Sequence, residues 1–128
     1  MKKIKIELVI EKGDNELWGS VKYNDNLIAD AGKNISDLEE KFKKLLNDFE
    51  SVDPESIEFI YLYDVYALFQ EFDFLNISKI AERVGINPGL MRQYASGVKH
   101  PSITRAKEIE NVLHELAAQL GKTLIYAA

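Results

Sequence analysis

The segment 87–96, NPGLMRQYAS, places two side chains with base-reading chemistry next to each other. Arg92 can form a bidentate pair of hydrogen bonds with guanine, and Gln93 can do the same with adenine. In an amphipathic helix both lie on the solvent side. The same side holds four more residues, Asn87, Pro88, Gly89 and Ser96. Because Pro88 and Gly89 offer no side-chain donor to a base edge, base recognition would depend on Arg92 and Gln93, while Gly89 would let a phosphate approach the helix N-terminus.

Positive charge is concentrated around this segment, although the whole chain carries a net charge of −5. Residues 1–63 hold 9 Lys/Arg and 14 Asp/Glu, whereas residues 79–107 hold six Lys/Arg against Glu82 alone, a net charge of +5. Such a local excess is the electrostatic footprint of a surface that meets phosphates. The side chains expected to contact phosphates without reading sequence are Ser78, Lys79, Lys99 and His100. An ion pair with Glu82 or with another acidic residue is the alternative for Arg92.

The residues around the base-reading pair have the pattern of a helix-turn-helix. A small residue, Ala81, would let the two helices approach, and Gly85 would take the left-handed conformation of the turn. The other inward positions hold Ile80, Val84, Ile86, Met91 and Tyr94. Asn76 and Asn87 are the expected N-caps, and Pro88 suits the first position of the second helix. The pattern favours a DNA-binding unit, with a helical module that makes only protein contacts as the alternative.

Two flanking helices complete this part of the chain. Residues 64–72, DVYALFQEF, place four apolar side chains on one side of a helix: Val65, Leu68, Phe69 and Phe72. A helix capped by Ser102 carries an apolar stripe from Ile103 to Leu120, and it is longer than one small motif needs. It either only covers the motif or packs its far end, with residues 123–128, on a second subunit. A homodimer or higher oligomer would suit two DNA half-sites one helical turn apart.

Alternating apolar residues predict a sheet in the first half of the chain. Apolar side chains recur at every second position of residues 3–12, which is the period of a strand with one buried face. Turn residues at 13–15 and 23–26 separate two further strands, residues 17–24 and 27–31. A fourth strand is predicted at residues 56–64, SIEFIYLYD.

One helix is predicted between the third and fourth strands. Ser36 and Glu39 have the spacing of a capping box. A helical stripe that would lie on the sheet follows, made of Leu38, Phe42, Leu45, Leu46 and Phe49. Asp53 and Pro54 would end this helix. The expected fold class is α+β, with a βββαβ domain at 1–63 and an all-α helix-turn-helix domain at 64–128.

Carboxylates on the predicted sheet and helix leave a metal-dependent nuclease open as an alternative. Glu7, Glu39 or Glu40, and Asp64 would suit a divalent cation if they converged. With 14 acidic residues in the first 63, one carboxylate on each element is expected by chance. The sequence has no phosphate-binding glycine loop and no serine nucleophile elbow. We therefore expect no catalytic residues, no metal site and no cofactor.

Composition indicates a soluble cytoplasmic protein. The chain has no cysteine, so a disulfide framework is excluded and a reducing compartment is expected. His100 and His114 are not spaced for a joint zinc site. The N-terminal apolar residues alternate with charges, unlike a signal peptide, and no stretch approaches the roughly 18 apolar residues of a membrane span. No membrane partner is expected.

The segments YASGVKHPS (94–102) and KEIENVLHELAAQL (107–120) resemble the C-terminal region of HicB-type antitoxins with a Cro/repressor-like helix-turn-helix. The βββαβ unit resembles their N-terminal domain, so the resemblance covers nearly the whole chain. It implies a partial ribonuclease H-like fold without nuclease activity, docked on a HicA-type toxin, which is a small mRNA-cleaving ribonuclease. It also implies that the C-terminal domain binds double-stranded DNA at its own operator as a dimer or higher oligomer. An acidic first half facing a basic toxin is electrostatically sensible.

Three functions remain open at this point. The first is an antitoxin-like transcriptional repressor whose N-terminal domain neutralises a toxin. The second is a stand-alone regulator or adaptor whose N-terminal domain binds another protein or a small molecule. The third is the metal-dependent nuclease.

Overall fold

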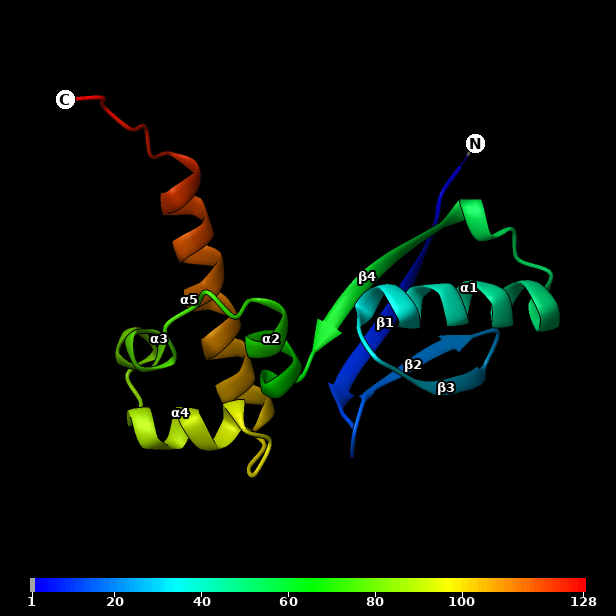
Figure 1. Cartoon of the computed structure of the whole chain (residues 1–128), viewed down its shortest axis with the longest axis horizontal. Coiled ribbons are helices and arrows are strands. Elements are labelled where there is room, and N and C mark those ends of the chain that lie inside the picture. Colours follow the sequence, from blue (N-terminus) through cyan, green and yellow to red (C-terminus); the bar gives the residue numbers. More distant parts are fainter. Residues whose placement is uncertain (1) are drawn as a thin grey trace. The chain divides into compact units, whose positions relative to one another are not determined.

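The computed structural model describes residues 2–128 and has an α+β architecture, in which a four-stranded mixed sheet with its helix is followed by further helices (Figure 1). The chain divides into two compact units, residues 1–68 and 69–128. Within the described residues, no helix has both the length and the apolar character needed to cross a membrane.

The division between the units falls inside α2 (Val65–Glu71). The sequence predicts this boundary earlier, after Tyr63. The difference arises because the first turns of α2 belong to the first unit: Ala67 is buried in the core of the sheet, and its backbone N–H donates to Asp64 Oδ1 at 2.7 Å. Asp64 Oδ2 in turn accepts from the backbone N–H of Lys12 at 2.9 Å.

The first unit has the strand, strand, strand, helix, strand order that the sequence predicts, with one short 3-10 turn added. Its elements are β1 (Ile4–Lys12), β2 (Leu17–Tyr23), β3 (Asn26–Gly32), α1 (Ile35–Glu50), η1 (Pro54–Ser56) and β4 (Ile57–Tyr63). The strand order in the sheet is β3-β2-β1-β4. β1 pairs antiparallel with β2 and parallel with β4, so that Leu8 lies opposite Val21 on one side and Tyr61 on the other.

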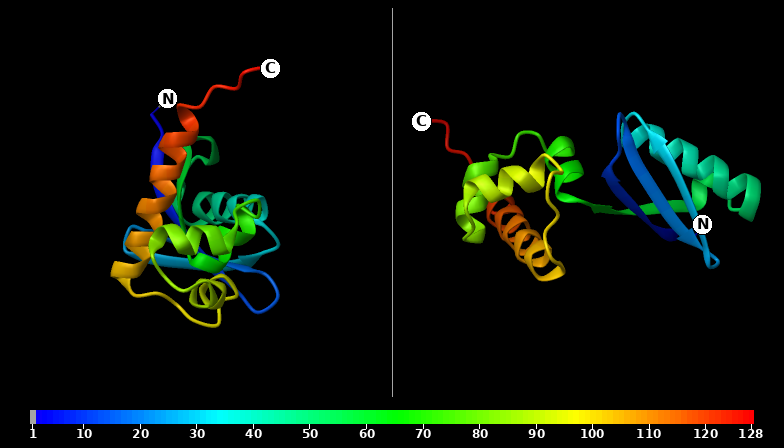
Figure 2. Two further views of the ribbon diagram at one scale, coloured as in Figure 1. Left: turned by 90° about the vertical axis from the view of Figure 1, so that its left-hand side faces the viewer. Right: turned by 90° about the horizontal axis from the view of Figure 1, so that it is seen from below.

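The core of the first unit lies between α1 and one face of the sheet, and Figure 2 shows these two layers. Ile6, Leu8 and Ile10 alternate along β1 and are buried, as the period-two pattern predicts. From α1, Phe42 is fully buried against them. Gly19 in β2 lets the helix come close, because a Cβ there would lie only 2.8 Å from Phe42 Cε2.

The end of α1 differs from the sequence-based expectation. Phe49 was expected in the buried stripe, but its side chain is 75% exposed. Ser51 adopts a left-handed backbone conformation after the helix, and the N–H of Val52 then donates to Leu46 O at 3.2 Å. The chain thus turns back after the helix, and Val52 is buried in the core. The prediction for Phe49 was wrong because helical periodicity gives the direction of a side chain. It does not show whether other residues are present in that direction to cover the side chain.

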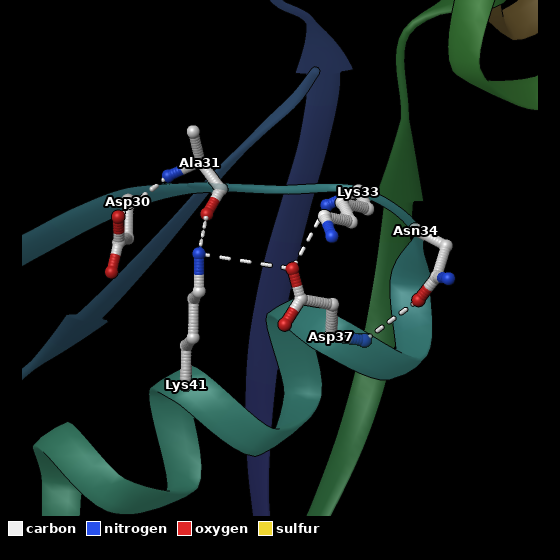
Figure 3. Close-up of polar contacts among 6 residues, drawn as sticks. All are labelled: Asp30, Ala31, Lys33, Asn34, Asp37 and Lys41. Carbon is white, nitrogen blue, oxygen red and sulfur yellow. Dashed lines mark hydrogen bonds and ion pairs between the residues drawn. The ribbon is translucent and has the colours of Figure 1, made fainter.

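The N-terminus of α1 also differs, as Figure 3 shows. Asn34 is the N-cap, and its Oδ1 accepts from the N–H of Asp37 at 2.8 Å. Asp37 Oδ2 accepts from the N–H of Lys33 at 2.9 Å, which makes the arrangement reciprocal. The predicted capping box of Ser36 and Glu39 is therefore wrong, because the helix begins at Ile35 and Ser36 lies inside its first turn. Glu39 accepts instead from the hydroxyl of Tyr61 in β4, at 2.7 Å.

Replacing Asn34 by Ala should lower the free energy of unfolding by about 1 kcal/mol, because the N–H of Asp37 loses its acceptor. Ser36→Ala is the matched control and should leave stability within about 0.5 kcal/mol of the original value. Urea denaturation followed by circular dichroism measures both. A larger loss for Ser36→Ala than for Asn34→Ala would contradict the cap assignment.

The face of the sheet opposite α1 is exposed and partly apolar. Alternation along the strands directs four large apolar side chains to it: Trp18, Leu27, Ile60 and Leu62. Glu7 lies on the same face, opposite Ile60 in the register of β1 and β4. Large exposed apolar patches are uncommon on the surfaces of monomeric soluble proteins.

The second unit contains three helices after α2: α3 (Ile77–Val84), α4 (Pro88–Ala95) and α5 (Ile103–Gly121). The side chains buried in this unit are Phe69, Ile80, Ala81, Met91, Tyr94, Ala95 and Ile109. In Figure 1, α3 is seen nearly end-on while α4 runs across the view, so the two short helices are steeply inclined to each other. α5 is the long helix of this unit.

Candidate nucleic-acid interface

A tight turn joins α3 to α4. Gly85 adopts a left-handed conformation with φ of +87°, and its N–H donates to the carbonyls of Ala81 and Glu82. Ala81 is fully buried, and its small side chain leaves room for the close packing of the two helices. The side chains of Asn76 and Asn87 cap α3 and α4, and Pro88 stands in the first turn of α4. These local predictions are all confirmed.

The outer side of α4 is determined by what its inner side buries. Met91, Tyr94 and Ala95 are buried, and a helix of 3.6 residues per turn then directs the intervening residues outward. The exposed residues of this side are Arg92, Gln93 and Ser96. Arg92 and Gln93 are thus adjacent and accessible on the same surface, which is the arrangement that base contacts require.

Arg92 contacts α3 and not an acidic side chain. Its Nη1 donates to Ser78 Oγ at 3.3 Å. Glu82, the alternative partner, instead lies 3.7 Å from Lys79 Nζ. Among residues 2–128 no carboxylate forms an ion pair with Arg92. Ser78 was expected to contact a phosphate, and the structure places it beside Arg92 instead of alone on the surface.

The segment after α4 folds back on the end of that helix. Gly97 has a φ of +79°, and the backbone N–H groups of Val98 and Lys99 then donate to Gln93 O at 3.0 and 3.2 Å. The side chains of Lys99 and His100 are exposed. The backbone of Lys99 is therefore held at the same end of α4 as Gln93.

Several of the counted cations are paired with acids of the same unit. The ion pairs are Lys79–Glu82, Arg105–Glu108 and Lys107–Glu110. The hydrogen bond from Lys107, at 2.8 Å, together with its positive charge, lowers the pKa of the Glu110 carboxyl below its ordinary value. Because Glu108 and Glu110 lie just beyond the segment 79–107, the local positive charge is smaller than that segment suggests.

The carboxylates considered for a metal site do not converge. Glu7 lies on the open face of the sheet, whereas Glu39 lies on α1 and binds Tyr61 on the covered face. Asp64 accepts hydrogen bonds from two backbone N–H groups, of Lys12 and Ala67. In the part of the chain that the structure describes, no three His, Asp or Glu side chains are placed to hold a metal ion.

Two features of the molecule were not foreseen from the sequence. One is the contact between Ser78 and Arg92, which lie on different helices and which the motif assigns to different roles. The other is the exposed apolar face of the sheet, for which the available signal was the presence of Trp18 and Leu27 at outward positions of their strands. The chain matches no family model, and no curated protein or solved structure is significantly similar to it.

Proposed function

We propose that the chain is a DNA-binding transcriptional repressor of the antitoxin type, which binds its own operator through α4 as a helix-turn-helix reader. The observation that carries this proposal is the adjacent exposure of Arg92 and Gln93 on the outer side of α4. Lys99 and His100 at the end of that helix supply exposed groups for the DNA backbone. In this arrangement side chains read base edges in the major groove, and the cations fix the register.

The operator complex is proposed to contain a homodimer or higher oligomer. Support comes from the far end of α5 and the segment after it, where Leu120 is 71% exposed and Leu124 and Ile125 are each 94% exposed. These apolar side chains have no cover in the second unit, and a second copy could bury them. Light scattering of the purified chain should give a mass of at least two copies, and Leu120→Asp with Ile125→Asp should reduce it.

The first unit is proposed to have the partial ribonuclease H-like fold of HicB-type antitoxins and to hold a basic protein partner, a HicA-like mRNA-cleaving toxin. Its net charge of −5 over residues 1–63 would speed encounter with such a partner. The exposed apolar side chains of Trp18, Ile60 and Leu62 provide contact area.

A stand-alone regulator or adaptor remains the second candidate. It is favoured by a shallow hollow on the open face of the sheet, whose lining includes Glu7, Val9, Ser20, Lys22 and Leu27. Co-expression with the product of an adjacent short reading frame separates the two candidates. Retention of a basic ribonuclease on the tagged chain favours the antitoxin, whereas retention of none favours the stand-alone regulator.

Replacing Lys99 by Ala should weaken binding to specific and random duplex DNA about equally. A lysine that contacts a phosphate releases about one counterion, so the negative slope of log K against log salt should become shallower by about one. Fluorescence anisotropy with a duplex from the region upstream of the gene, repeated at several salt concentrations, measures this slope. The affinity of a protein without a basic surface for the same duplexes serves as the background. If the unmodified chain binds no duplex more tightly than this background, the proposed function is refuted.

A further inference from the structure

The first turn of α4 contains a glycine, which the capping side chain of Asn87 contacts and over which a side chain from the next turn extends. Pro88 and Gly89 begin the helix, and Gly89 has no side chain to extend over this turn. Long side chains on a helix lean toward its N-terminus, so Arg92 extends back over the turn that contains Gly89. A Cβ built at Gly89 would lie 3.9 Å from Arg92 Nη2, which places the guanidinium beside the glycine.

Ser78 holds the same guanidinium from the other helix. Its Oγ accepts from Arg92 Nη1 at 3.3 Å, across the joint between α3 and α4. Ser78 is half-buried, so its hydroxyl is less free to move than a surface group, whereas Arg92 is exposed and has no ion pair among the described residues. The guanidinium therefore has one hydrogen-bond partner in the protein and one glycine beside it.

We propose that Ser78 is a positioning residue that orients Arg92 toward a single guanine, in place of the phosphate contact that its position in the motif suggests. The proposal rests on the proposed function, since it assumes that α4 meets DNA. A guanidinium has five N–H donors, so the hydrogen bond to Ser78 leaves four for the N7 and O6 atoms of guanine. Orientation before binding removes part of the entropy loss that an exposed arginine otherwise suffers when it forms a bidentate contact.

The test uses a duplex that the unmodified chain selects from a randomised library. Each guanine is replaced in turn by 7-deazaguanine, which lacks the N7 acceptor, and affinity is measured by fluorescence anisotropy. At one position the unmodified chain should lose about tenfold in affinity. Ser78→Ala should weaken binding of the guanine duplex about threefold to tenfold and should weaken binding of the 7-deazaguanine duplex much less.

Coupling between the two residues is the decisive measurement. In an Arg92→Ala background, Ser78→Ala should have no further effect, because the group that it orients is gone. Ser78→Thr keeps a hydroxyl acceptor and should restore most of the guanine preference. The salt dependence of binding should be the same for Ser78→Ala and the unmodified chain, since no phosphate contact is lost.

Two outcomes overturn the proposal. If Ser78→Ala weakens all duplexes equally, lowers the salt slope and adds fully to Arg92→Ala, Ser78 contacts a phosphate. If the unmodified chain depends on one guanine but Ser78→Ala leaves that dependence unchanged, this inference fails while the proposed function stands. Selection of no duplex by the unmodified chain would instead refute the proposed function. Ser36→Ala, an exposed helical serine of the other unit, is the control, and circular dichroism checks that each variant folds.

Discussion

Replacing Phe42 by Ala should lower the free energy of unfolding by about 3–5 kcal/mol. The side chain is fully buried between α1 and the sheet, so its removal leaves a cavity as well as losing apolar contact. Gly19 lies directly against the ring and cannot fill the space, because glycine has no side chain to move. The loss of stability should therefore be large, because the cavity left by Phe42→Ala stays unfilled.

Phe49→Ala is the matched control, since it is the same chemical change on the same helix. The side chain of Phe49 is 75% exposed, so Phe49→Ala should change the free energy of unfolding by no more than about 0.5 kcal/mol. Urea denaturation followed by the fluorescence of Trp18 measures both variants, because the only tryptophan of the chain lies in β2 of the same unit. Equal losses for the two variants would show that Phe49 is buried and that the end of α1 is placed wrongly.

The sequence predicts the sheet well where burial depends only on direction. The alternation of Ile6, Leu8 and Ile10 defines the covered face of β1 without reference to distant residues. The sequence fails at the two ends of α1, where the result depends on which groups compete. Asn34 and Ser36 are both good capping residues. Which of them caps the helix depends on the residue at which β3 ends.

The candidate site shows the same division. The caps, the turn glycine and the outward direction of Arg92 follow from local pattern and are confirmed. The partner of Arg92 does not follow, because a long side chain has many rotamers and both Ser78 and Glu82 lie within one turn of each other on α3. Charge counted along the sequence also overstates the positive surface, since Glu110 binds Lys107 from one turn away.

Replacing Arg92 by Ala should remove the preference for one base pair of the operator, at a loss of about 1–3 kcal/mol for the cognate duplex. Arg92→Lys should not restore that preference, because an ammonium group keeps the charge but loses the planar pair of donors. Gln93→Ala should relax the preference at a different base pair. Gln93 is the next residue along the helix, so its side chain would reach a different part of the groove from that of Arg92. Competition binding against duplexes with single base-pair changes measures each preference.

Arg83→Ala and Lys99→Ala separate a loss of base reading from a loss of charge. Both remove one exposed cation of the second unit, and neither residue lies on the outer side of α4. Arg83→Ala and Lys99→Ala should therefore keep the ranking of the competing duplexes while Arg92→Ala changes it. If all three variants weaken every duplex by the same factor, Arg92 acts only as a charge and α4 does not read sequence. That result would favour a helical unit that contacts only the phosphate backbone of the DNA. The specificity of the repressor would then have to come from another surface.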